Sequence, residues 1–520
     1  MTISGVSGRT SYIGSGILDL RNQLETLTQQ LSSGKISNTY AGQGTGRSLA
    51  IALRSQINGL AGYADTAVNL NTRINVANLS LQQLANTISS VKGAAVSAGS
   101  TIDNTGQTAG QKTASLGFFN SVDMLNAQSG DRYLFSGRAT DTAPVTAANV
   151  IMDGNGAAIA GLKQVISERK IADLGVNLNG RVSSAVGTPV TSVGITEEDA
   201  TPAPPLTAQP FGLKLSAVST SIAGATVTQP ADLPATVPPA LPATPVQKSM
   251  SVDLGTSNPA VGDQVKFTFK LPDGTSEDIV MTASDTTPLA ANSFLIGADP
   301  TATAANLNTE LTKSVKALAN GPLVAASAME AGDNFFDDPP MRVDATPSLG
   351  GATALVAGTK ANTVIWYNGE KGTDSARGTA VAKVDNGIAV QYGARANEQA
   401  LRTELQNVAV FAAVTTSATD PNANAQIAAL NQRVAQNLAV VPGTQTIQDI
   451  QADFAGAQAS IKSTTDRQTQ TKAISQTLLD SIEGIDDNEV ATKILALQTA
   501  LQASYQTTSQ LYQMSLVKFL

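Results

Sequence analysis

Residues 11–35 read SYIGSGILDLRNQLETLTQQLSSGK, and this stretch decides the fold. Its apolar residues recur in steps of four and three, the a/d pattern of a helix that packs along one narrow seam. Gly34 predicts the end of the helix, because glycine adopts the left-handed conformation common there. A helix with so narrow a seam needs a partner helix. We expect the seam to consist of Ile13, Ile17, Leu20, Leu24, Leu27 and Leu31.

A second, longer seam runs from about residue 50 to 98. Globular helices usually span about 8–20 residues, so a helix of this length indicates a stalk. The seam is expected to pass through Asn71 and Asn78 and to slip by three residues after Leu81. The two asparagines either set the register from within the core or turn to solvent. The stalk core predicted here comprises Leu53, Ile57, Leu60, Ile74, Leu81, Leu84 and Ile88.

Helical seams return in the last part of the chain. Ile427, Leu430, Val434 and Phe454 are predicted to complete the stalk core. The last helix should pair with the first, and because its apolar stripe reaches the final residue, we expect that end to be buried on assembly. The assembly residues expected on it are Leu497, Leu501, Tyr505, Leu511, Tyr512, Leu516, Phe519 and Leu520.

The middle of the chain has a different character. Residues 202–245 are rich in proline and predict a linker, residues 265–281 predict a β-hairpin, and residues 302–319 a helix. Residues 364–367 predict a short β region. The expected fold is mostly α with inserted α/β and β regions: an antiparallel long-helix coiled-coil stalk formed by the two terminal segments, with a variable head between them. The predicted divisions are 1–45 and 481–520 for the terminal helices, 46–145 and 401–480 for the stalk, 146–249 for a loop and β region, 250–335 for an α/β insert and 336–400 for a returning β region.

Composition excludes much chemistry. The 520 residues include no histidine, the commonest general base and metal ligand, and no cysteine. We therefore expect no enzyme, no metal site and no cofactor. Acidic pairs at 197–199, 337–338 and 486–489 could be catalytic carboxylates, but we interpret them as solvated loops or a helix start.

Charge and hydropathy bear on partners. The 33 basic and 41 acidic residues give a net charge of −8, which disfavours nucleic-acid binding. No apolar run is long enough for membrane insertion. The first residues lack the apolar segment of a cleaved signal peptide, so we expect a cytoplasmic protein or one exported without such a signal.

Several segments resemble the bacterial flagellin family. Leu24 to Lys35 is similar to the family's helix that ends in an L-S-[ST]-G-K turn. Within the family, four segments resemble the third type of hook-associated protein, which joins hook to filament, as found in alphaproteobacteria. These segments are Asp131–Gly137 with the following Thr140–Thr142, Trp366–Gly369, Tyr392–Glu398 and Met514–Leu520.

The resemblance implies a structural subunit of the extracellular flagellum, exported through the flagellar type III apparatus. It implies self-assembly of the terminal helices into a ring or helical polymer. The implied partners are copies of itself, other hook-associated proteins, flagellin and a cytoplasmic export chaperone at the C-terminal helix. The large insert keeps a filament flagellin as the alternative, and a surface glycan-binding protein as a weaker one.

Overall fold

The computed structural model describes residues 4–97, 99–156, 158–198, 209–231 and 247–517, with side chains described only over 12–513 at the two ends. The chain divides into two compact units. We call Met1–Asn71, Ala382–Val390 and Gly456–Leu520 the terminal unit, and Thr72–Val381 with Gln391–Ala455 the central unit.

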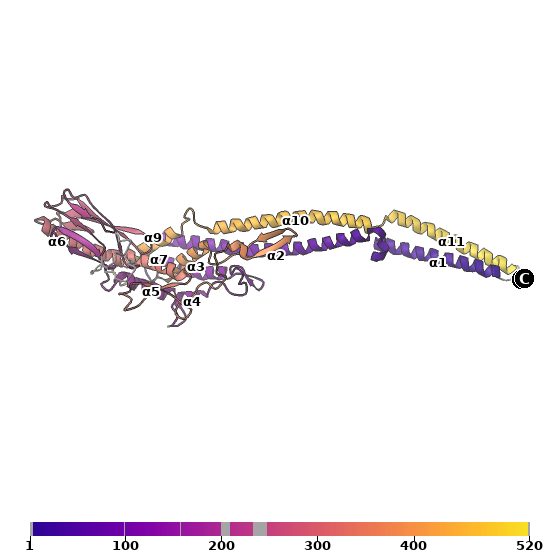
Figure 1. Ribbon diagram of the computed structural model, residues 1–520, viewed down its shortest axis with the longest axis horizontal. Coiled ribbons are helices and arrows are strands. Elements are labelled where there is room, and N and C mark those ends of the chain that lie inside the picture. Colours follow the sequence, from indigo (N-terminus) through magenta and orange to yellow (C-terminus); the bar gives the residue numbers. More distant parts are fainter. Residues whose placement is uncertain (1–3, 98, 157, 199–208, 232–246, 518–520) are drawn as a thin grey trace, which may run out of the picture. The chain divides into compact units, whose positions relative to one another are not determined.

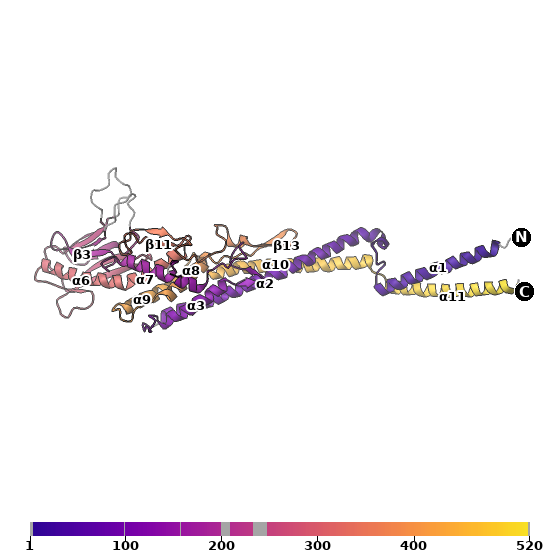
Figure 2. The ribbon, with the colours of Figure 1, turned by 90° about the horizontal axis from the view of Figure 1, so that it is seen from below.

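In the terminal unit the two ends of the chain lie side by side. Helix α1 (Ser4–Ser33) packs along α11 (Asp487–Val517), as Figures 1 and 2 show, which confirms the expected pairing. Gly34 follows α1 with a φ of 67°, and its N–H bonds to the carbonyl of Gln30. A 3₁₀ segment, η1 (Tyr40–Gly46), then leads into α2 (Arg47–Ser97), and α10 (Ile447–Glu483) precedes α11.

Helix α2 has 51 residues, as the long seam predicted, but the seam takes a different course. Leu70 and Ala77 are buried, whereas Asn71 and Asn78 are only half-buried beside it. The slip in phase therefore lies at Ala67 and Leu70, not after Leu81. The stripe takes two successive steps of three residues, from 64 to 67 and from 67 to 70. These steps shift it by one position, so that Leu70 lies in the core in place of Asn71.

The central unit contains a group of shorter helices: α3 (Ala109–Leu125), α4 (Ala148–Asp153), α5 (Leu162–Leu174), α7 (Pro322–Phe336), α8 (Gln399–Ala413) and α9 (Ala423–Asn437). Helix α3 packs on α8, and α7 packs on α5, α8 and α9. Short pieces complete the unit or lead from it: β1 (Gln128–Ser129) with β2 (Arg132–Tyr133), β11 (Met341–Val343) with β12 (Leu355–Ala357), η2 (Ala376–Thr379), and β13 (Val381–Asp385) with β14 (Ile388–Gln391).

The head of the central unit has two four-stranded sheets and α6 (Pro300–Asn320). One sheet has the order β3-β4-β7-β6, from Val182–Val186, Ser192–Glu197, Ser249–Asp253 and Thr226–Thr228. The other has the order β10-β9-β8-β5, from Ser293–Leu295, Ser276–Ser284, Gln264–Lys270 and Lys214–Thr220. Only the β9–β10 pair is parallel among the described strands of these sheets.

The hairpin and the helix predicted at 265–281 and 302–319 are confirmed as β8–β9 and α6. The predicted boundary at 249/250 differs from the structure, because it cuts through both sheets. The hairpin's apolar face, including Phe267 and Phe269, is fully buried and needs a second sheet opposite it.

Two further predictions are corrected. The described part of the proline-rich stretch, 209–231, contains β5 and β6, since Leu215 and Val218 are buried in the head core. The rest of that stretch lies outside the described residues. Residues 364–367 form isolated bridges instead of a strand: Val364 N–H bonds to the Ala160 carbonyl, and Tyr367 bridges to Val145.

Candidate assembly surface

The pairing of α1 with α11 uses one narrow stripe. On α1 the side chains of Ile13, Ile17, Leu20, Leu24 and Leu27 are half-buried, and none of its described side chains is fully buried. The opposing stripe on α11 contains Val490, Ile494, Leu497 and Leu501. A single chain thus removes little apolar surface from water here, and the pair gains correspondingly little stability.

Other predicted assembly residues lie off this stripe. Tyr505, Leu511 and Tyr512 are 47%, 45% and 60% exposed, and Leu31 is 40% exposed. Ser504 and Thr508 continue the half-buried positions of α11 in their place. Tyr505 and Tyr512, which we call the aromatic row, are therefore available for contact with another chain. The side chain of Leu516 and the whole of Phe519 and Leu520 lie outside the described residues.

The predicted stalk-core residues belong to more than one core. Leu53, Ile74, Leu81, Leu84 and Ile88 are buried along α2, and Ile57 and Leu60 are half-buried. Leu53 and Ile57 meet Leu479 and Ile482 of α10 within the terminal unit. Phe454 is buried on α10, whereas Ile427, Leu430 and Val434 are buried on α9, which packs on α7 and α8.

A buried charge cluster that the sequence did not predict links the end of α10 to α2 and to the segment between α1 and α2. Glu483, 4% exposed, accepts hydrogen bonds from Arg54 Nε and Gln43 Nε2, both at 2.9 Å, and Lys35 lies 3.8 Å away. The hydrogen bond from Arg54 lowers the pKa of Glu483. The backbone adds two bonds, from Ile36 N–H to the Glu483 carbonyl and from Ile485 N–H to Gly34. Helices α1 and α2 are thereby held to the end of α10.

The acidic pairs have structural partners. Asp337 pairs with Arg402 at 3.1 Å, and Asp338 with Lys371 at 2.5 Å. Asp486 accepts hydrogen bonds from two N–H groups at the start of α11. These roles agree with the structural interpretation of the acidic runs at 337–338 and 486–489, whereas Glu197 ends strand β4 and pairs with Lys214. Among the described residues, no cluster of carboxylates could hold a metal ion.

The hydropathy of the helices bears on whether the chain could span a membrane. Of the helices in the described ranges, none combines the length and the apolar character required to cross a bilayer.

Comparison with known proteins identifies the C-terminal part of the chain. Residues 442–520 match the family model described as the bacterial flagellin C-terminal helical region. No curated protein matches the chain. The matched segment contains α10 and α11, the helices that carry the exposed aromatic row and the Glu483 cluster. Flagellins are structural, non-enzymatic proteins that polymerise in the extracellular flagellum. The match covers these C-terminal residues, and over them the chain is similar to the helical region of bacterial flagellins.

Proposed function

We propose that this chain joins the flagellar hook to the filament. The observation that carries the proposal is that three segments similar to junction proteins, far apart in sequence, meet in the central unit. Phe135 accepts a hydrogen bond from Ala396 N–H, and Gly137 N–H bonds to Ala394. The third segment is joined through the residue that directly follows it: Glu370 N–H bonds to the Ser136 carbonyl, and the Glu370 carboxylate pairs with Arg138. Together the similar segments form one contiguous piece of structure, which a chance resemblance of separate short motifs does not require.

The terminal helices supply the means of assembly in this proposal. The weakly buried α1–α11 pair would be completed by neighbouring subunits that cover the exposed row at Tyr505 and Tyr512. Segments that order on binding bury apolar surface only at that moment, which suits a subunit exported unfolded. The proposed partners are copies of the chain, other hook-associated proteins, flagellin and an export chaperone that holds the C-terminal helix before assembly.

Deletion of the gene tests the junction role. We expect cells to make hooks without attached filaments and to release filament protein into the medium, and a plasmid copy should restore attachment. Stable filaments on the hooks of the deletion strain would refute the junction role.

The alternative is a filament flagellin, favoured by the size of the head, whose strands extend from Val182 to Leu295. Filaments contain many copies of their subunit and a junction only a ring of them. Quantitative mass spectrometry of sheared filaments distinguishes the two, because a filament subunit would dominate the sample.

Glycan binding is the third candidate, and the structure offers it little support. Trp366, the single tryptophan, is 3% exposed and donates its indole N–H to the Phe336 carbonyl at 2.9 Å. It therefore cannot stack on a sugar ring. A glycan array probed with the full chain tests this function, and we expect no bound sugar.

A further inference from the structure

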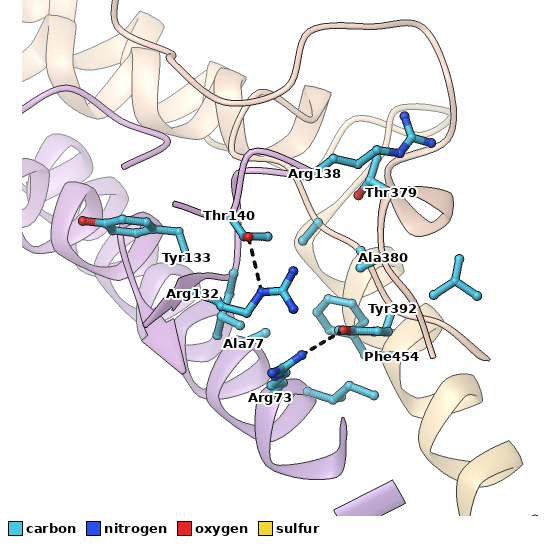
Figure 3. Close-up of a pocket in the computed structure, with 16 residues that line it drawn as sticks. Arg73, Ala77, Arg132, Tyr133, Arg138, Thr140, Thr379, Ala380, Tyr392 and Phe454 are labelled. Carbon is cyan, nitrogen blue, oxygen red and sulfur yellow. Dashed lines mark hydrogen bonds between the residues drawn. The ribbon is translucent and has the colours of Figure 1, made fainter. Parts of the chain in front are cut away.

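A pocket of about 250 Å³ lies within the central unit, beside the segments that carry the junction resemblance. Figure 3 shows its lining, which comes from α2, the 132–140 loop, residues 379–381 and 392–394, and Phe454. Ile74, Ala77 and Phe454 are each less than 5% exposed and form an apolar floor. The pocket is therefore a defined cavity on a packed base.

Three arginines line the same pocket. Arg138 is neutralised by Glu370. Arg73 donates to the Tyr392 hydroxyl at 3.3 Å, and Arg132 donates from Nε to the Thr140 hydroxyl at 3.3 Å (Figure 3). Both acceptors are neutral. In the part of the chain that the structure describes, neither Arg73 nor Arg132 has a carboxylate within ion-pair distance.

Two uncompensated guanidinium groups at one pocket point to an anionic ligand. Asp131 and Asp141, in the same loop, are exposed and pair with neither arginine. Arginine binds a carboxylate through two parallel hydrogen bonds, which are stronger than its present bonds to hydroxyl groups. The apolar floor suits the methylene groups of an aspartate or glutamate side chain.

We propose that this pocket receives a carboxylate side chain of a second copy of this chain. The inference rests on the proposed function, in which copies assemble. Charge complementarity favours this occupant, because the chain carries a net charge of −8 and each copy therefore has more carboxylates than basic groups of its own to pair with them. Asp65 and Asp123, for example, are exposed and have no ion pair among the described residues. A repeated contact of this kind fixes the register of neighbours as well as adding affinity.

Paired substitutions test the contact in the full-length chain. The double variant Arg73→Gln/Arg132→Gln removes two positive charges at the pocket. Its control, Lys270→Gln/Lys316→Gln, removes two exposed positive charges from the head. We expect the pocket variant to raise the protein concentration at half-maximal assembly, measured by sedimentation, by about tenfold or more, since a charged hydrogen bond is lost at each contact. The control should assemble like the unmodified chain, and Arg73→Lys/Arg132→Lys should recover part of the loss.

A photo-crosslinking amino acid at Tyr133, which lines the pocket, identifies the occupant. In an assembly of isotopically light and heavy copies, we expect crosslinks between copies, on a peptide that contains an aspartate or glutamate. Crosslinks confined to single copies would overturn the proposal, as would equal assembly of the pocket variant and the unmodified chain.

Failure of the pocket inference can be distinguished from failure of the proposed function. If the unmodified chain assembles and the pocket variant matches it, the pocket inference fails and the proposed function stands. If the unmodified chain fails to assemble even with purified hooks and flagellin, the proposed function fails, and the second copy as occupant fails with it.

Discussion

Arg54 and Glu483 are 429 positions apart in sequence, yet the guanidinium of one is paired through two hydrogen bonds with the carboxylate of the other. The Glu483 side chain is 5% exposed and that of Arg54 is 37% exposed. Arg54 lies about two turns from the start of α2, and Glu483 is the last residue of α10. The pair therefore fixes the point at which the chain passes from the α2–α10 region to the α1–α11 pair.

Replacement of Glu483 by glutamine should loosen this junction. The variant keeps the size of the side chain but leaves Arg54 without its charged partner, a loss of about 1.5–3 kcal/mol for hydrogen bonds to charged groups. Hydrogen exchange of residues 34–46 should accelerate. The control is Glu489→Gln, whose carboxylate is 63% exposed and pairs with an exposed lysine, so its effect should be within about 0.5 kcal/mol. Equal effects of the two substitutions would contradict the role assigned to Glu483.

The same pair predicts sensitivity to acid. Because the pKa of Glu483 is lowered in the folded chain, its stabilising contribution is present above the ordinary value of 4.5 and is lost as the pH falls through the folded value. Exchange of residues 34–46 should therefore increase below about pH 4 in the unmodified chain. In Glu483→Gln the exchange rate, corrected for intrinsic chemistry, should change less over the same range.

Glu404 predicts the opposite pH dependence in the central unit. Burial raises the pKa of its carboxyl to about 7, although the charge of Lys92 opposes the shift. Since the folded value lies above the ordinary 4.5, stability falls as the pH rises from about 4.5 to 7 and then levels off. Glu404→Gln should gain on the order of 2 kcal/mol at pH 8 relative to the unmodified chain, and nothing at pH 4. Urea unfolding at both pH values measures this, with exposed Asp123→Asn as the control; equal gains at both pH values would contradict it.

Local patterns predicted the elements of this fold well. The end of α1 at Gly34, the length of α2 and the β8–β9 hairpin all depend on residues within a few turns or one hairpin of each other. The course of the seam through Leu70 and Ala77 was not predictable in this way, since it depends on which face the partner elements cover.

In the candidate assembly surface, too, the features set by local sequence were predicted and those set by distant residues were not. The apolar stripe of α1 followed from periodicity. The buried pair of Arg54 and Glu483 did not, because nothing local distinguishes that glutamate from the exposed acidic residues near it. Strands β5 and β6 were missed because the prolines around them dominate the composition of that stretch.

Arg433 should be among the most sensitive positions of the central unit. Its side chain is 4% exposed and bonds from Nε to Asp273 at 2.7 Å, in the turn between β8 and β9. Arg433→Ala leaves Asp273 buried without its partner, and breaking such a pair costs about 3–5 kcal/mol. Lys266→Ala, which breaks an exposed pair with Asp278, should cost at most about 1 kcal/mol. Denaturant unfolding of the full chains measures both, and a cost for Arg433→Ala no larger than for the control would show that the buried pair contributes little.

The half-buried stripe of α1 predicts ends that open readily in dilute solution. Trypsin should cut at Arg21, which is exposed on α1, well before it cuts at Arg169 and Arg181, which are 2% and 4% exposed in the central unit. Leu24→Ala removes a half-buried contact with α11, and a loss of about 1 kcal/mol should accelerate the cut at Arg21 about fivefold. Leu18→Ala, 59% exposed on the same helix, should leave the rate nearly unchanged in the dilute chain. Assembly should protect Arg21 in all three proteins, since neighbours then cover the helix. Resistance of Arg21 in dilute unmodified chain would show that the terminal pair is stable alone and needs no neighbour to complete it.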